Sequence, residues 1–304
     1  MPINKTWIQT CVAAAVLTLA QPILADNHAK SDSFKTVKVT DQISMLQGKG
    51  GNLGLLSGKQ GLLLIDSEYK KLSAVLKQEL KNYGGTDALT YIINTHWHGD
   101  HTQGNLALGQ YAPIVAHDNV RARLLTRQEI KLFKMIVEPY PEIALPSITY
   151  DKTMTLHINA EEVEIKHYAN GHTDGDSVVF FKKANVVHTG DHFFSGMFPF
   201  VDVDTGGNVL NMATNIKAIL KRIDNKTKII PGHGPLSNKA DMQAFHDMLI
   251  GTSAEVKAMR DKGLSLEQIK KKGLSNQWQP WTKGIFPADF WIGIVHSSLE
   301  KNKQ

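Results

Sequence analysis

The chain has 304 residues, of which 42% are hydrophobic and 21% are charged, a composition that supports a sizeable buried core and excludes global disorder. Its net charge of +5, from 34 Lys and Arg against 29 Asp and Glu, is too dispersed to indicate nucleic-acid binding. The single cysteine excludes an internal disulfide, an iron–sulfur centre and a thiolate zinc cluster, whereas the 13 histidines stand out.

Residues 1–25 are typical of a secretory signal peptide. Lys5 precedes an apolar run at 12–20 that is too short to span a bilayer. We expect cleavage after Ala25, which leaves a mature chain without cysteine; a retained membrane anchor is the alternative. The polar residues 26–35 are expected to form a flexible leader. The sequence therefore predicts a secreted or periplasmic protein with no stable membrane insertion after cleavage.

The first half of the chain predicts an antiparallel meander that leads into a helix. Apolar runs separated by turn residues predict strands at 36–40, 43–47, 52–56 and 61–65. Helical spacing of leucine and valine over 72–80 then predicts a helix that ends near Gly84. A short buried strand is expected at 91–93, directly before a histidine-rich segment.

The second half of the chain repeats this pattern. Strands are expected at 153–157, 162–167, 177–181, 185–188 and 228–230, with a helix over 210–223 before the last of them. Two such halves predict two sheets packed face to face with helices outside, an α/β (α+β) fold. Residues 118–137 and 239–300 are expected to be largely helical. We therefore predict one catalytic domain over 36–304 with a helical C-terminal tail.

Potential metal ligands gather directly after the strand at 91–93. The segment 96–101, His-Trp-His-Gly-Asp-His, holds three imidazoles and one carboxylate. Burial of that much polarity without partners is costly, and metal coordination removes the cost. On such a loop His96 and His98 can point to one site while Asp100 and His101 reach a neighbouring one.

Three later strands end in similar motifs. His172 lies in Asn-Gly-His-Thr-Asp-Gly at 170–175, Asp191 follows the strand at 185–188, and His233 lies in Pro-Gly-His-Gly-Pro at 231–235. Flanking glycines let the backbone place a side chain at a strand end without steric cost. Any one of these motifs alone is more often a turn, but together they predict a metal centre.

The combined motifs resemble those of the metallo-β-lactamase superfamily. The HxHxDH signature is present at 96–101, followed by GHT at 171–173, GD at 190–191 and PGHG at 231–234. The resemblance covers most of residues 36–240. It implies a four-layer αββα sandwich, which agrees with the two meander-plus-helix halves.

The resemblance also implies a complete dinuclear ligand set. By resemblance, one metal is held by His96, His98 and His172. The second is held by Asp100, His101 and His233, and Asp191 bridges the two. Two zinc ions are expected, with iron as the alternative. One subclass of true β-lactamases places a cysteine at the second site, which this chain lacks; its ligand set is instead that of hydrolases such as glyoxalase II and lactonases.

Residues outside the ligand set carry weaker predictions. Asp100 is expected to be catalytic by orienting a metal-bridging hydroxide and moving its proton. The predicted pocket wall comprises Trp97, His192, Phe193, Met197 and Phe198, and residues 48–54 are a candidate flap. The predicted supporting residues are His117, at an expected strand end, Asp174 and Asp176. For each of these residues, packing or turn capping is the competing interpretation.

These features predict an exported dinuclear zinc hydrolase that attacks the carbonyl of a small cyclic amide or ester, in the manner of a β-lactamase. The alternatives are a thioester, acyl-ester or lactone hydrolase of the glyoxalase II or lactonase type, an iron-dependent sulfur dioxygenase, and a non-catalytic periplasmic zinc-binding protein. The expected partner is a small-molecule carbonyl substrate, and no nucleic acid is expected. The sequence indicates no oligomeric state.

Overall fold

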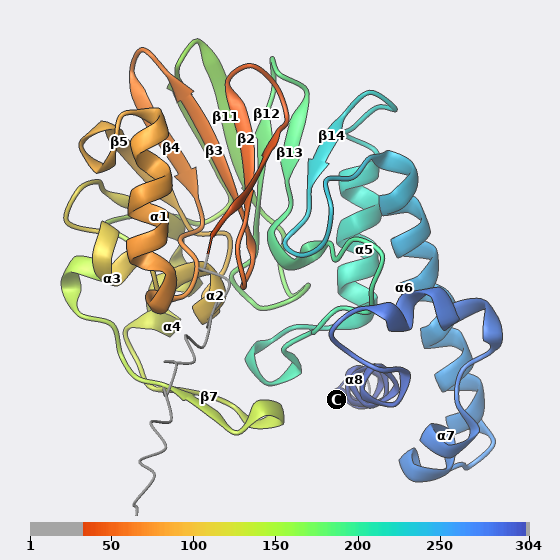
Figure 1. Cartoon of the computed structure of the whole chain (residues 1–304). Helices are drawn as coiled ribbons and strands as arrows, with labels where there is room; N and C mark the ends of the chain where they lie inside the picture. The colour runs from red at the N-terminus through yellow and green to blue at the C-terminus, as the bar shows by residue number, and fades with distance from the viewer. Residues whose placement is uncertain (1–32, 302–304) are drawn as a thin grey trace, which may run out of the picture. The chain divides into compact units, whose positions relative to one another are not determined.

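Two β-sheets lie at the centre of the protein in the computed structural model, which describes residues 33–301 (Figure 1). The predicted signal peptide and most of the predicted leader lie outside the described residues. None of the helices in this described range is long and apolar enough to cross a membrane.

The first sheet has seven strands in the order β1-β2-β3-β4-β5-β6-β9. They are β1 (Lys35–Lys38), β2 (Ile43–Gln47), β3 (Asn52–Gly58), β4 (Gly61–Ile65), β5 (Leu89–Ile93), β6 (Ile114–His117) and β9 (Ile148–Tyr150). The first four strands form the predicted antiparallel meander, and the next three continue the sheet in parallel. Strand β9 was not predicted, because Thr149 separates its two apolar residues and leaves no compact apolar run.

The second sheet has five strands in the order β10-β11-β12-β13-β14. They are β10 (Thr153–Ile158), β11 (Glu161–His167), β12 (Ser177–Phe181), β13 (Val186–His188) and β14 (Lys228–Ile230). The first four are antiparallel and β14 runs parallel to β13. All five strands were predicted within one or two residues of their ends.

Helices cover the outer face of each sheet, so the fold is the predicted αββα sandwich (Figure 1). Helices α1 (Ser73–Leu80) and α3 (Asn105–Leu108) pack on the first sheet. The second sheet is covered by α5 (Val209–Leu220), α6 (Lys239–Asp261) and α8 (Ala288–Lys301). A separate apolar cluster fills the space between the sheets, with Met45 and Ile65 from one and Val163 and Phe181 from the other. Burial of that apolar surface is the main stabilisation of the sandwich.

The prediction that residues 118–137 are largely helical is correct only for 118–124 and wrong for the rest of the segment. Helix α4 spans Asp118–Leu124, and the chain then forms a hairpin of β7 (Gln128–Ile130) and β8 (Met135–Val137) that joins neither large sheet. Lys134 adopts the left-handed conformation (φ 50°) that reverses the chain between the two strands. The C-terminal part of the described chain contains α6, α7 (Leu266–Lys272) and α8, and a 3-10 segment at Asn276–Lys283 separates α7 from α8.

Candidate metal centre

The seven predicted ligands lie on loops and a short helix that follow strands. His96 and His98 follow β5, while Asp100 and His101 lie in the adjoining α2 (Gly99–Thr102). The remaining three follow β11, β13 and β14 and are His172, Asp191 and His233. The structure brings all seven together in two groups, His96 with His98, His172 and Asp191, and Asp100 with His101 and His233.

The first group is buried and tightly spaced. Each residue offers one ligand atom, and these atoms all lie within 4.8 Å of one another. The Nε2 atom of His172 is 2.8 Å from Nδ1 of His98 and 3.4 Å from Oδ2 of Asp191. The Nε2 atom of His96 is 3.8 Å from the same carboxylate oxygen. Three imidazole nitrogens therefore face one carboxylate oxygen.

Asp191 also contacts the second group. Its Oδ1 atom is 3.1 Å from Nε2 of His101, and its Oδ2 atom is 3.4 Å from Nε2 of His233. The Asp100 Oδ2 atom lies 3.5 Å from His101 Nε2 and 3.3 Å from His233 Nε2. The carboxylate of Asp191 thus stands between the two groups, in the position of a bridging ligand.

Several buried atoms of the cluster make no hydrogen bond, which tests whether it fits metal ions. Nε2 of His96, Nε2 of His101 and Oδ1 of Asp191 are all buried without a hydrogen bond in the described structure, although the last two lie 3.1 Å apart. Leaving such atoms without a partner costs about 1–3 kcal/mol each. Imidazole nitrogen and carboxylate oxygen are ordinary zinc and iron ligands. The donor set therefore fits a dinuclear metal site.

The electrostatics of the cluster also favour a bound cation. Burial opposes ionisation of Asp191, but His101 and His233 outweigh it and hold the Asp191 pKa well below its usual range. Burial likewise opposes charge on His233, yet Asp191 and Asp100 raise its pKa to about 9. Without metal, protonated imidazoles balance the two carboxylates. Metal ions that displace those protons would supply positive charge in their place.

Two carboxylates orient ligand histidines by contacting the ring nitrogen that does not face the cluster. Neither of them was identified from the sequence. Asp66 Oδ2 lies 2.7 Å from Nδ1 of His101, and Asp202 Oδ2 lies 3.0 Å from Nε2 of His98. Such contacts fix which ring nitrogen faces the metal. Asp202 is 104 residues away from His98 along the chain, so no local motif pointed to it.

Of the three predicted supporting residues, one contacts the metal centre. The Asp176 carboxylate accepts hydrogen bonds from the backbone N–H groups of His172, at 2.6 Å, and Thr173, at 2.9 Å. The predictions for the other two are corrected. Asp174 pairs with Arg123 at 2.7 Å. His117 caps α4 and stacks on His167, with ring centroids 3.6 Å apart.

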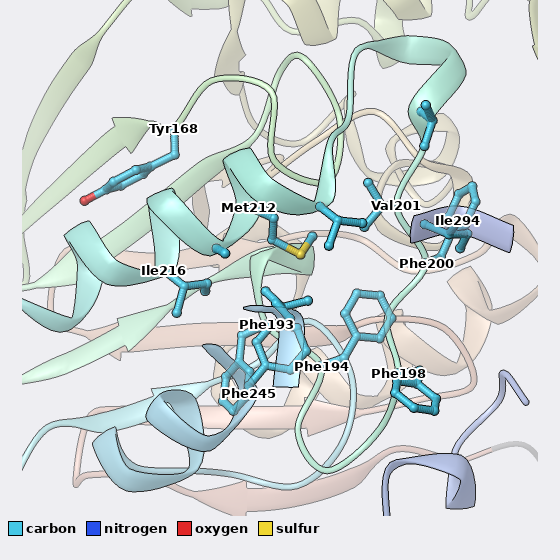
Figure 2. Close-up of a cluster of buried hydrophobic side chains, with 14 of the residues drawn as sticks. Tyr168, Phe193, Phe194, Phe198, Phe200, Val201, Met212, Ile216, Phe245 and Ile294 are labelled. Atoms are coloured by element: carbon cyan, nitrogen blue, oxygen red, sulfur yellow. The ribbon is translucent and has the colours of Figure 1, made fainter. Parts of the chain in front are cut away.

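The predicted pocket wall is also corrected, because its members pack into the interior. Trp97, His192, Phe193 and Phe198 are completely buried, and Met197 lies against Gly284. The Phe193 and Phe245 rings are neighbours, with centroids 5.2 Å apart (Figure 2). The segment after Asp191 packs against the C-terminal helices, and this packing sets the direction of each side chain.

Two other phenylalanines of that segment contact the metal centre. The Phe194 ring stacks on His233 with centroids 4.7 Å apart. The Phe200 ring lies 5.6 Å from that of His98, and the Phe200 carbonyl accepts a hydrogen bond from His172 at 2.8 Å. Both residues line the cavity at the metal centre, whereas the five predicted residues do not.

This metal-centre cavity has a volume of about 350 Å³. His98, Asp100, Asp191 and His233 lie in its wall. The remaining wall is mostly apolar. It comes from the β7–β8 hairpin, the segment 194–200 and the loop before α8. Its apolar residues are Ile130, Phe133, Met135, Val137, Phe194, Phe200, Ile285 and Phe286. The cavity thus combines a polar metal-binding floor with apolar sides.

The predicted flap at 48–54 contributes Lys49 and Gly50 to the same wall. Their backbone N–H groups each donate to the Glu68 carboxylate at 2.6 Å. Residues from 52 onward belong to β3. The part of this segment that faces the cavity is therefore held by a buried carboxylate.

Comparison with known proteins agrees with this geometry. The family model described as "Metallo-beta-lactamase superfamily" matches residues 47–233, a range that contains all seven clustered residues. A "probable metallo-hydrolase" of Methanocaldococcus jannaschii is 29% identical over 206 residues, which cover 63% of this chain and 91% of that protein. The type 2 metallo-beta-lactamase of Bacillus cereus is 24% identical over 222 residues, which cover 71% of this chain and 80% of that protein.

A solved structure supports the fold at lower identity. The crystal structure of the DIM-1 metallo-beta-lactamase matches with a TM-score of 0.58 at 18% identity, covering 72% of this chain and 97% of that chain. The matched family range ends at residue 233, so the helices from α6 onward lie beyond it.

Proposed function

This chain belongs to the metallo-beta-lactamase superfamily, and from that membership we propose that it is an exported dinuclear zinc hydrolase that cleaves a small cyclic amide or ester. One observation carries the proposal. The Asp191 carboxylate stands between two groups of ligand atoms on the floor of a cavity with apolar sides. Cavities of this size that combine few polar groups with apolar walls are typical of small-molecule sites.

The chemistry divides between the metal ions and the chain. When bound, two zinc ions would activate a water molecule and polarise the substrate carbonyl. Asp100 lines the cavity beside His101 and His233, where its carboxylate would orient that water and could accept a proton from it. Tyr69 also lines the cavity. Burial and the nearby Asp100 raise the Tyr69 pKa to about 12, which keeps its hydroxyl protonated as a donor to the substrate.

The walls favour substrates that carry an apolar substituent. Ile130, Phe133 and Phe286 come from two separate segments and face the same space. Similarity to the Bacillus cereus metallo-beta-lactamase supports a cyclic amide as the first substrate to test. The apolar walls support a second candidate, hydrolysis of a lactone, acyl ester or thioester by the same groups.

The test is a metal analysis of the purified protein together with a hydrolysis panel. The panel contains a chromogenic cephalosporin, an acyl lactone, an acyl thioester and a phosphodiester. We expect close to two zinc ions per chain and turnover of the cephalosporin or the lactone. Asp191→Ala should lose bound zinc and reduce kcat/KM by at least about 100-fold, because both groups lose a ligand. The control is Asp174→Ala, because the Asp174 carboxylate pairs with Arg123 and not with the metal centre; this variant should keep its zinc and its activity.

Three outcomes would contradict the proposal. The first is a zinc-loaded protein that hydrolyses no compound of the panel. The second is full activity in Asp191→Ala. The third is bound iron with oxygen consumption on a persulfide, which would indicate a sulfur dioxygenase. Export is tested separately by the mass of the mature N-terminus, for which we expect cleavage after Ala25.

A further inference from the structure

A second and larger cavity adjoins the metal-centre cavity. It is a groove of about 870 Å³, formed by the β7–β8 hairpin, residues 200–204 and the helices α7 and α8. Its apolar lining includes Ile130, Leu132, Phe200, Val201, Phe290 and Ile294. Phe200, Val201 and Ile294 are seen close to one another in Figure 2. The hydrolysis of a small ring alone would leave this groove without an occupant.

The two cavities share part of their walls. Ile130 and Phe200 line both of them. The Phe133 ring lies 4.9 Å from that of Phe200 and 6.0 Å from that of Phe290, which lines the groove. Phe286, in the wall of the metal-centre cavity, stacks on Phe290 at 4.4 Å. These aromatic rings form a continuous apolar surface from one cavity to the other.

The shared wall begins at the metal ligands. The Phe200 ring lies 5.6 Å from His98 and 5.7 Å from His172. Asp202, which contacts His98 at 3.0 Å, also lines the groove. A substrate whose carbonyl lies at the metal centre therefore has the groove within reach of its substituent.

The charges around the groove indicate an uncharged occupant. Its exposed or half-exposed rim carries three cationic side chains, Lys131, Lys270 and Lys301, and three anionic ones, Asp204, Asp289 and Glu300. Lys270 lies 3.2 Å from Glu267, and Lys301 lies 4.0 Å from Asp204. A balanced rim above an apolar lining neither attracts nor repels a charged group, so apolar burial dominates binding.

We propose that the groove binds an apolar tail of the substrate, so that the preferred substrates are acyl-bearing lactones or esters whose chain runs from the metal centre past Ile130 and Phe200. This inference rests on the proposed hydrolase function and narrows its substrate class. The hairpin residue Phe133 is 41% exposed, and its ring contacts both Phe200, which lines the two cavities, and Phe290, which lines the groove. The tail replaces solvent along that aromatic surface.

A series of 4-nitrophenyl esters from butanoate to decanoate tests the proposal with the zinc-loaded protein. Each added methylene should raise kcat/KM by about fourfold, the factor that corresponds to burial of one CH₂ group. Gly293 lies on α8 in the groove wall, and a Cβ atom there would meet only Lys270 Cε, at 3.9 Å. Gly293→Trp therefore fills the groove, and we expect it to abolish the preference for decanoate over butanoate.

The matched control is Ala244→Trp, at an exposed position of α6 that lines neither cavity; it should keep the full chain-length preference. If Gly293→Trp fails to fold, Ser297→Trp on the same wall of the groove replaces it. An equal kcat/KM for all chain lengths in the wild-type protein would overturn the proposal. So would an unchanged chain-length preference in the folded groove variant.

Calorimetric binding of sodium decanoate and sodium butanoate separates this inference from the proposed function. Decanoate should bind at least about tenfold more tightly than butanoate, and Gly293→Trp should remove that difference. If neither the esters nor any compound of the hydrolysis panel is hydrolysed but this binding pattern holds, the hydrolase proposal is wrong and the groove proposal is supported. If esters are hydrolysed while decanoate and butanoate bind with equal affinity, the hydrolase proposal is supported and the groove proposal is wrong.

Discussion

Four histidines of the metal centre make a second contact through the ring nitrogen that points away from the cluster. The partners are Thr95 Oγ1 for His96 at 3.1 Å, Asp202 for His98 at 3.0 Å, Asp66 for His101 at 2.7 Å and the Phe200 carbonyl for His172 at 2.8 Å. Each contact fixes the ring orientation and the tautomer, because only one nitrogen remains available to a metal. At the scale of single residues, metal affinity therefore depends on groups that are not ligands.

We predict that Asp202→Ala lowers zinc affinity at the group containing His98. Loss of such a supporting carboxylate typically weakens metal binding about 10–100-fold, because the imidazole loses both its orientation and part of its basicity. Competition with a chromophoric chelator measures the change.

The control for this prediction is Asp204→Ala, two residues along the chain, whose carboxylate faces Lys301 at 4.0 Å. Asp202 also caps a 3-10 turn by accepting from the backbone of Thr205, so thermal melts of the metal-free variants must accompany the titration. Equal zinc affinity in the wild-type protein and Asp202→Ala would contradict the predicted role.

The β7–β8 hairpin is the element that gives the metal-centre cavity its apolar character. It pairs with neither large sheet, yet Ile130, Phe133 and Met135 line the cavity. Leu132 and Ile136 are about half exposed. An element with this many exposed apolar side chains and little support from the sheets is typical of a binding surface.

We expect Phe133→Ala to raise KM about tenfold for an ester with an apolar chain. The ring contacts Phe200 and Phe290, and burial of a partly exposed aromatic side chain by substrate contributes about 1–2 kcal/mol. Steady-state kinetics on the decanoate ester measure the effect. The control is Ile136→Ala in the same hairpin. Ile136 lines neither cavity, so its truncation should leave KM unchanged. Equal effects of the two substitutions on KM would argue against a specific contact of Phe133 with the substrate.

Prediction from sequence succeeded for most strands and failed for this hairpin. The strands at 43–47, 61–65, 177–181 and 228–230 have the predicted bounds, because each is a compact apolar run between turn residues. Strands β7 and β8 have three residues each, and the segment 128–137 that contains them has no Gly, Pro, Asn or Asp to mark the turn between them. The apolar residues from Val120 to Val137 also occur at intervals compatible with a helix, so periodicity favoured the wrong element.

At the scale of the whole molecule, the C-terminal helices are part of the core. Helices α6 and α8 pack with α5 over the second sheet (Figure 1). Trp291 of α8 is completely buried, donates a hydrogen bond to Thr252 of α6 at 2.9 Å and stacks on Phe198 at 5.6 Å. Helix α8, together with α7, also forms one side of the groove, so stability and substrate contact depend on the packing of the same helix.

Replacement of Trp291 by alanine should therefore lower the free energy of unfolding by about 3–5 kcal/mol, through lost apolar burial and the cavity left behind. Urea denaturation followed by circular dichroism measures the change. Ile285→Ala is a suitable control, since Ile285 is 64% exposed and its truncation should change stability by less than about 0.5 kcal/mol. A loss below about 1 kcal/mol in Trp291→Ala would show that α8 is dispensable to the core.

The sequence by itself determined the positions of most strands along the chain and the seven residues that cluster at the metal centre. Metal-binding chemistry depends on residue type, and His96, His98 and Asp100 stand together in one short motif. His172 and His233 were also recognised from local sequence, because each lies next to glycine just after a predicted strand. Such features can be recognised in a single sequence because each motif is defined by residues that are neighbours along the chain.

Only the tertiary structure decided what surrounds those residues. The cavity wall includes Phe194 and Phe200 and not Phe193 and Phe198, because packing against distant helices sets which side chains face the cavity. The pairing of Asp202 with His98, across 104 residues, and the groove that joins a hairpin to α8 arise in the same way. These contacts join segments far apart in the chain, so their geometry follows from how the layers pack and not from any local pattern.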